Sequence, residues 1–299
     1  MAEPKAGHGT DANDTLHRFL FERLGIRGEL VRLGASWRAL HAGHDYPAPV
    51  RAQLGRAVAA SVLLSATIKF DGNLILQAQG DGPLGMLVAQ ATSRRTFRGL
   101  AHWHGAVPEG DLATMHGVGR LVMTLEPSGD GERYQGIVPL EGATLAAALE
   151  TYFRQSEQLD TALWLAADAG QAAGLLLQRL PGKVEDADAW GRVEHLAATI
   201  TDAELLTLPG GEIIHRLFHE EDVRLFDAEP VSFRCSCSRE RVAAAIRGLG
   251  RAEAESILAE QGRIAADCEF CNRHYEFDHV DVEALFVDVS VHDASTNKH

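Results

Sequence analysis

The stretch that decides how the last part of the chain folds is 232–241, SFRCSCSRER, in which two cysteines stand one residue apart. A second pair follows in 267–277, DCEFCNRHYEF, so the spacing is Cys235-x-Cys237-x30-Cys268-x2-Cys271. These four are the only cysteines among 299 residues. Two close thiolate pairs match a structural zinc site, in which the protein supplies all four ligands. The spacing therefore predicts one Zn²⁺ per chain, bound by these cysteines.

Two other interpretations of the cysteines are weaker. A metal-free cluster of buried thiols would give two close pairs no reason to converge. A thioredoxin-type dithiol is disfavoured because no βαβ pattern surrounds the CxxC motif. His274 follows three residues after Cys271 and is expected near the site or exposed, because four cysteines already fill the coordination shell.

The size of the surrounding segment supports a metal. Residues 234–290 are expected to form a small C-terminal domain with helices at about 238–248 and 252–262, each closed by a glycine, followed by a hairpin that carries Cys268 and Cys271 at its turn. Domains this small rarely fold on a hydrophobic core alone. Metal binding would then supply on the order of 10 kcal/mol of folding free energy.

Positive charge surrounds both cysteine pairs. Zinc bound to four thiolates carries a net charge of about −2, which neighbouring guanidinium groups would stabilise. The same charges would keep the sulfurs as thiolates, the form that oxidants attack. The arginines expected to do this are Arg234, Arg239, Arg241 and Arg273.

Oxidation would change what the cysteines connect. If an oxidant converted each pair into its own disulfide, Cys235–Cys237 and Cys268–Cys271, the metal would be released. Two small local rings would replace a link across 30 residues, and local rings constrain an unfolded chain far less. The small domain would then unfold.

Residues 15–182 are expected to form an α+β domain. Short β-rich runs bounded by Gly, Asp or Pro alternate with apolar positions at helical spacing. The predicted strands are 27–33, 73–80, 120–127, 133–140, 162–167 and 174–180, and the predicted helices are 50–68 and 144–155. Residues 1–14 are expected to be disordered, and residues 291–299 to form a tail.

Residues 183–233 are expected to form a metastable helical linker. The segment holds twelve acidic and four basic residues, a net −8 of the chain's −14. Apolar stripes at 190–200 and 213–218 predict two amphipathic helices, and Thr201 with Glu204 forms a capping box. Short, highly charged helices need a surface to dock on if they are to stay folded.

Composition and motifs argue against several functions. The acidic charge disfavours nucleic-acid binding, and the polar start and short apolar runs predict a cytoplasmic protein without a membrane span. The glycine-rich stretches complete no phosphate-binding motif, and there is no GxSxG elbow. His215 and His219 have zincin spacing, but Arg216 occupies the position of the catalytic base. His102 and His104 lack a third ligand and are expected at the surface.

The sequence resembles one known family along its whole length. The resemblance is carried by LHRFLFERLGIRGELVRL, SATIKFDGNLILQAQGDGPL, LLTLPGGEIIHRLFHEE, FRCSCSRERV and SILAEQGRIAADCEFCNRHYEF. These segments are similar to the bacterial 33-kDa heat-shock chaperones, also called redox-regulated chaperonins. All four cysteine positions agree with the family's CxC and CxxC pattern.

The resemblance implies a reduced, zinc-bound form with little activity. It also implies an oxidised form with two disulfides and no zinc, which holds unfolding client proteins without ATP under oxidative or heat stress. The linker is implied to unfold with the zinc domain, and homodimers to form on activation. The leading interpretation is thus a redox-regulated holdase rather than an enzyme. The alternative is an α+β enzyme or nucleic-acid factor with a purely structural zinc ribbon.

Overall fold

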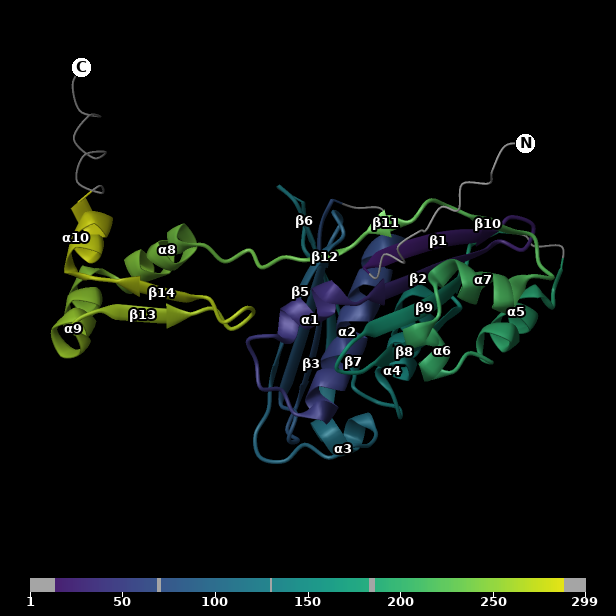
Figure 1. Cartoon of the computed structure of the whole chain (residues 1–299), viewed down its shortest axis with the longest axis horizontal. Helices are drawn as coiled ribbons and strands as arrows, with labels where there is room; N and C mark the ends of the chain where they lie inside the picture. The colour runs from purple at the N-terminus through teal and green to yellow at the C-terminus, as the bar shows by residue number, and fades with distance from the viewer. Residues whose placement is uncertain (1–13, 69–70, 130, 183–185, 288–299) are drawn as a thin grey trace, which may run out of the picture. The chain divides into compact units, whose positions relative to one another are not determined.

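The computed structural model describes residues 14–68, 71–129, 131–182 and 186–287, which form two compact units; along the chain, the first ends at Arg234 and the second begins at Cys235 (Figure 1). The predicted tail and nearly all of the predicted disordered start lie outside the described residues. Asp14 is the exception, because its carboxylate accepts hydrogen bonds from the backbone nitrogens of Gly34 (2.8 Å) and Ser36 (3.1 Å). Among the described helices, none is long and apolar enough to cross a lipid bilayer.

The first unit contains two six-stranded sheets. The first sheet has the order β10-β1-β2-β9-β8, with β11 also paired to β1, and the second has the order β12-β5-β4-β3-β6-β7. Every pair is antiparallel except β12 with β5. The long strands are β1 (Thr15–Phe21), β2 (Ile26–Leu33), β3 (Gly72–Gly80), β4 (Met86–Thr92), β5 (Thr96–His102), β6 (Gly119–Pro127), β7 (Tyr134–Pro139), β8 (Thr161–Ala167) and β9 (Ala172–Arg179).

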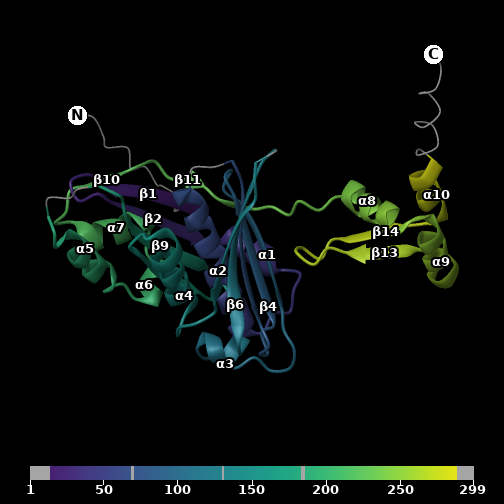
Figure 2. The same ribbon diagram turned by 180° about the vertical axis from the view of Figure 1, so that it is seen from behind.

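Helix α2 (Ala48–Thr67) lies between the two sheets (Figures 1 and 2). Its residues 57–60 and 62–64 are completely buried, and they belong to a core that takes side chains from both sheets. Small residues let α2 pack closely against the first sheet: a Cβ on Gly55 of α2 would lie 2.5 Å from the Cβ of Ala167 on β8. The predicted central helix and all six predicted strands are present. The other helices of this part are α1 (Ala35–His41), α3 (Leu112–His116) and α4 (Leu145–Tyr152), which continues as a π-helical turn, Phe153–Glu157.

The segment predicted as a linker is folded onto the first sheet. Helices α5 (Ala189–Ala197), α6 (Asp202–Thr207) and α7 (Gly210–Phe218) cover the face of this sheet that is opposite α2 (Figure 1). Thr201 and Glu204 form the expected capping box. The segment thus belongs to the first unit rather than standing between two units, because its apolar stripes complete a second core with β1, β2, β8 and β9.

The helices expected in the linker are present, but the last part of the segment is extended. Strands β10 (Val223–Leu225) and β11 (Glu229–Pro230) pair with β1, and β12 (Ser232–Phe233) pairs with β5. We call residues 223–233 the strap. Glu229 anchors the strap through ion pairs with Arg18 (2.5 Å) and Arg95 (2.7 Å).

The second unit is a small α/β module. It contains α8 (Arg239–Leu249), α9 (Arg251–Gln261), β13 (Ile264–Asp267), β14 (His274–Phe277) and α10 (His279–Val287). The two predicted helices and the hairpin are present, whereas α10 was not predicted. The core of the second unit contains only a few buried apolar residues: Ala243, Ile246, Ala254, Leu258, Ile264, Tyr275, Phe277 and Val282.

Candidate metal centre

The hairpin turn positions the second cysteine pair. Strands β13 and β14 pair from Ile264 with Phe277 to Asp267 with His274. In the turn, the backbone nitrogens of Cys271 and Asn272 donate to the carbonyl oxygen of Cys268 at 3.2 and 2.7 Å. Asn272 adopts a φ of +52°, in the left-handed region that asparagine tolerates better than most residues. The chain therefore reverses tightly between the CxxC motif and β14.

The first cysteine pair precedes the start of α8. Ser238 caps this helix, because its side chain accepts a hydrogen bond from the backbone nitrogen of Arg241 (3.3 Å). The guanidinium of Arg241 also donates to the Ser236 hydroxyl (2.8 Å), between the two cysteines. A helix cap thus fixes the CxC motif, as a tight turn fixes the CxxC motif.

The four predicted cysteines come together. Their sulfurs all lie within 4.8 Å of one another, with Cys235 and Cys268 3.6 Å apart and Cys237 and Cys271 3.4 Å apart. A tetrahedral zinc with Zn–S bonds of about 2.3 Å separates its sulfurs by about 3.8 Å, whereas a disulfide bond is about 2.05 Å long. The four cysteines are free thiols. Their spacing fits a closed four-thiolate site for a metal ion.

The thiols differ in acidity. Burial raises the pKa of Cys235, and it raises the pKa of Cys271 to about 12. Burial acts in the same direction on Cys237, but hydrogen bonds from Tyr275 and the other thiols outweigh it and bring the Cys237 pKa to about 7. Without a metal, Cys237 therefore ionises before Cys235 and Cys271.

Tyr275 is a contact that the sequence interpretation missed. Its hydroxyl donates to the sulfur of Cys237 at 3.2 Å, while its ring belongs to the small core of the second unit. A hydrogen bond to a ligand atom orients that ligand and stabilises its charged form. The side chain thus joins the core of the unit to the cysteine cluster.

The predicted arginines have different roles. Arg273 carries the charge that interacts with Cys237 and Cys271. Arg239 instead donates to the carbonyl oxygen of Glu276 and to the carboxylate of Asp281, each at 2.7 Å, with its guanidinium 4.1 Å from the ring centre of Phe277. Arg241 binds Ser236 as described. Arg234 belongs to the first unit, where its backbone nitrogen donates to the carbonyl oxygen of Phe97.

The histidines do not extend the site. His274 lies between the carboxylates of Asp267 (2.6 Å) and Glu276 (3.0 Å), whose hydrogen bonds raise its pKa. The rings of His215 and His219 stack 6.0 Å apart on the exposed side of α7. Within the described ranges, the four cysteines are the only group of three or more His, Cys, Asp or Glu side chains with metal-binding geometry.

Comparison with known proteins agrees with this geometry. The family model described as Hsp33 protein matches residues 14–278. The chain belongs to the Hsp33 family. A 33 kDa chaperonin of Nitrosococcus oceani is 60% identical over 275 residues, covering 92% of this chain and 95% of the relative. A 33 kDa chaperonin of Shewanella woodyi is 48% identical over 276 residues, covering 92% and 96%.

A solved Hsp33 structure has the same fold. The crystal structure of a 33 kDa chaperonin from Thermotoga maritima matches with a TM-score of 0.81 at 23% identity, covering 91% of this chain and 97% of that one. The predicted α+β class is thereby confirmed. Membership of the Hsp33 family supports a chaperone role for this chain, and its curated relatives are named as chaperonins rather than as enzymes.

Proposed function

We propose that this chain is a redox-regulated, ATP-independent holdase: a binding protein, not an enzyme. In the reduced state, Cys235, Cys237, Cys268 and Cys271 hold one Zn²⁺ and the chaperone is inactive. Oxidation to the disulfides Cys235–Cys237 and Cys268–Cys271 releases the zinc, the second unit unfolds, and residues 183–233 leave the first sheet. The exposed surfaces then bind unfolding proteins in the cytoplasm during oxidative or heat stress, and the active form is a homodimer.

The observation that carries this proposal is the convergence of four free thiols in a unit with a small core. Eight buried apolar residues form that core, and the side chains of Cys237 and Cys268 pack against it. Bound zinc would tie the start of α8 to the hairpin turn and so supply folding free energy that the core lacks. The fold of the second unit therefore depends on the state of the four sulfurs.

The redox step balances with peroxide as oxidant. Each disulfide forms when two zinc-bound thiolates lose two electrons, and one peroxide molecule takes up these electrons and two protons from solvent to give two waters. The thiolate is the attacking species, and Cys237 has the lowest pKa of the shifted thiols. In the reduced state, sulfurs of different pairs lie 3.4 and 3.6 Å apart. If each disulfide forms within its own pair and the metal leaves, no bond joins the hairpin turn to the CxC motif.

The docked segment is suited to conditional unfolding. Its helices contain 9, 6 and 9 residues, lengths at which an isolated helix is not stable in water. What holds them is packing on the first sheet, where Phe218 contacts the rings of Phe19 and Phe21. A loss of docking would expose that apolar face, and exposed apolar surface is what an unfolding client recognises.

The test measures zinc content and chaperone activity on the same sample. Reduced, zinc-loaded protein is treated with peroxide at mildly elevated temperature, zinc is detected with a chromogenic chelator, and light scattering follows aggregation of a thermally unfolding client. We expect release of about one zinc per chain together with the appearance of holdase activity, and reversal by reductant. Zinc that stays bound, or leaves without any gain in client protection, would instead indicate a purely structural metal site.

A further inference from the structure

Met86 lies on the face of the second sheet that is opposite α2. Leu87, Ala89 and Ala91 of β4 belong to the core around α2. Side chains alternate between the two faces along a strand, so Met86 points to the other face. Met86 is only half-buried, and His102, its partner on the neighbouring strand β5, is exposed. Small solutes can therefore approach Met86 from this face.

Two glutamine amides point at the sulfur of Met86. Gln77 and Gln79 of β3 donate to Sδ through their side-chain nitrogens, at 3.7 and 4.0 Å. Arg120 of β6 orients Gln79, because its guanidinium donates to the Gln79 Oε1 at 3.0 and 3.3 Å. A guanidinium is only a donor, so the amide oxygen faces Arg120 and the amide nitrogen faces the sulfur.

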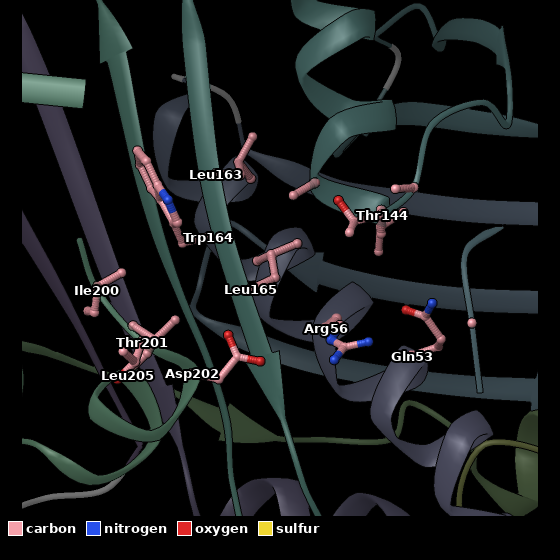
Figure 3. Close-up of a pocket in the computed structure, with 14 residues that line it drawn as sticks. Gln53, Arg56, Thr144, Leu163, Trp164, Leu165, Ile200, Thr201, Asp202 and Leu205 are labelled. Atoms are coloured by element: carbon pink, nitrogen blue, oxygen red, sulfur yellow. The ribbon is translucent and has the colours of Figure 1, made fainter. Parts of the chain in front are cut away.

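The distances leave a gap between this sulfur and the amides. Elsewhere in the first unit, Gln53, which lines the cavity shown in Figure 3, donates to the sulfur of Met115 at 3.3 Å. Both nitrogens near Met86 lie further from their sulfur than this. An oxygen atom bonded to the Met86 sulfur would fit the gap and accept from both nitrogens at about 2.9 Å. A thioether sulfur is a weak acceptor, whereas a sulfoxide oxygen is a strong one. The two donors therefore suit the oxidised side chain better.

We propose that Met86 is an oxidation site whose sulfoxide is bound by Gln77 and Gln79. With peroxide as the oxidant, the sulfur attacks one peroxide oxygen, the O–O bond breaks and an S–O bond forms. The sulfur loses two electrons, and the hydroxide that leaves takes the remaining proton from the sulfur-bound oxygen to become water. The step involves no cysteine, so it does not require the redox cycle proposed above.

The other described methionines are protected from this reaction. Met115 and Met123 are each 2% exposed and belong to the core around α2. A sulfoxide there would place a polar group among apolar side chains, which disrupts a core. At Met86 the same change adds an acceptor beside two donors. Oxidation of Met86 should therefore leave the first unit folded.

The test oxidises the reduced, zinc-loaded full-length chain with hydrogen peroxide. A thiol reductant and zinc then restore the cysteines and leave the sulfoxide in place. Peptide mass spectrometry measures the sulfoxide at each methionine, and we expect Met86 to be oxidised at least about tenfold faster than Met115 and Met123.

The configuration at sulfur distinguishes a bound sulfoxide from one that is merely exposed. An oxygen placed in the gap defines one of the two sulfur epimers. The peptide that contains Met86 is treated separately with methionine sulfoxide reductases A and B, because each enzyme reduces one epimer. We expect one epimer to exceed the other by about fivefold or more.

Two variants test the donors. Gln77→Leu/Gln79→Leu removes both, and Gln90→Leu is the matched control, because Gln90 lies on the same face but accepts from Arg98 (2.7 Å). Tryptophan fluorescence follows unfolding of the first unit in urea, since all four tryptophans lie in it. Oxidation should not favour unfolding of wild type or of Gln90→Leu. It should favour unfolding of Gln77→Leu/Gln79→Leu by about tenfold, and this variant should lose the epimer excess.

Three results would overturn the proposal. They are oxidation of Met86 no faster than that of Met115 and Met123, equal amounts of the two epimers, and a wild-type response to oxidation in Gln77→Leu/Gln79→Leu. The epimer ratio of the unmodified chain remains decisive even if the double variant does not fold.

Discussion

Replacement of Phe218 by alanine should release the docked segment without any oxidant. The side chain lies in α7, is 2% exposed and contacts two aromatic rings of β1. The ring centres of Phe19 and Phe21 lie 5.8 and 5.0 Å away, and Phe21 meets Phe218 edge to face. Phe218 is therefore the main aromatic anchor between α7 and the first sheet.

The expected magnitude follows from this burial. Truncation of a buried phenylalanine to alanine costs about 3–5 kcal/mol, including the lost ring contacts. At about 1.4 kcal/mol per factor of ten, the docking equilibrium should shift by roughly a hundredfold to several thousandfold. A segment held mainly by packing opens with less free energy than the whole domain. A shift of this size is therefore enough to populate the undocked form.

The assay uses reduced, zinc-loaded Phe218→Ala protein. We expect it to suppress client aggregation without peroxide and to become sensitive to proteolysis within residues 186–233, while its zinc content stays unchanged. His215→Ala is the matched control, because His215 is exposed on the same helix. An inactive but protease-sensitive Phe218→Ala protein would refute the link between undocking and client binding. A variant that remains protease-resistant would refute the estimate of docking energy.

Three further predictions concern the rest of the molecule. Tyr275→Phe removes the hydrogen bond to Cys237 and should weaken zinc binding about 10–100-fold in a chelator competition; unchanged affinity would show that the bond does not support the ligand. Chelation of zinc under reducing conditions should abolish amide protection in α8 and α9 while that of β2 and β9 persists, and a protected second unit would contradict its dependence on metal. Burial raises the pKa of Glu29 from 4.5 to about 7, against the opposing charges of Arg27, Arg18 and Arg95. Its contribution to stability is therefore full below about pH 4.5 and is lost as the pH rises to about 7, so wild type should lose about 3 kcal/mol relative to Glu29→Gln over this range. A constant difference between the two denaturation curves would show that Glu29 titrates normally.

Strands with a strongly apolar run of their own could be predicted from the sequence, and strands defined by distant partners could not. Strand β3 contains the consecutive residues Leu74, Ile75 and Leu76, whereas β4 has alanine at two of its buried positions and was missed. Strands β11 and β12 have two residues each, too few to show a period. Their conformation is set by β1 and β5, which lie far away in the sequence.

The same limit applies to the cysteine cluster. The spacing alone was enough to predict that the four cysteines form one metal site, because each pair lies within a short loop. Nothing in the local pattern assigned the hydroxyl of Tyr275 to Cys237, since that contact joins residues 38 positions apart. Arg239 was expected to balance the charge of the sulfurs, but Asp281 on the unpredicted helix α10 binds its guanidinium. Side chains whose partners come from unpredicted elements cannot be assigned from sequence spacing.

The strap described above forms edge strands of two different sheets. Strands within its residues 223–230 supply the outermost neighbours of β1, and its last two residues supply the outermost neighbour of β5. Any event that lifts it leaves two rows of unpaired backbone amides and carbonyls, and such rows accept an extended polypeptide of almost any sequence. A single displacement of the strap would thus expose one edge on each of two sheets, and each edge could bind an extended polypeptide. The ion pairs that hold Glu229 to Arg18 and Arg95 keep both rows covered.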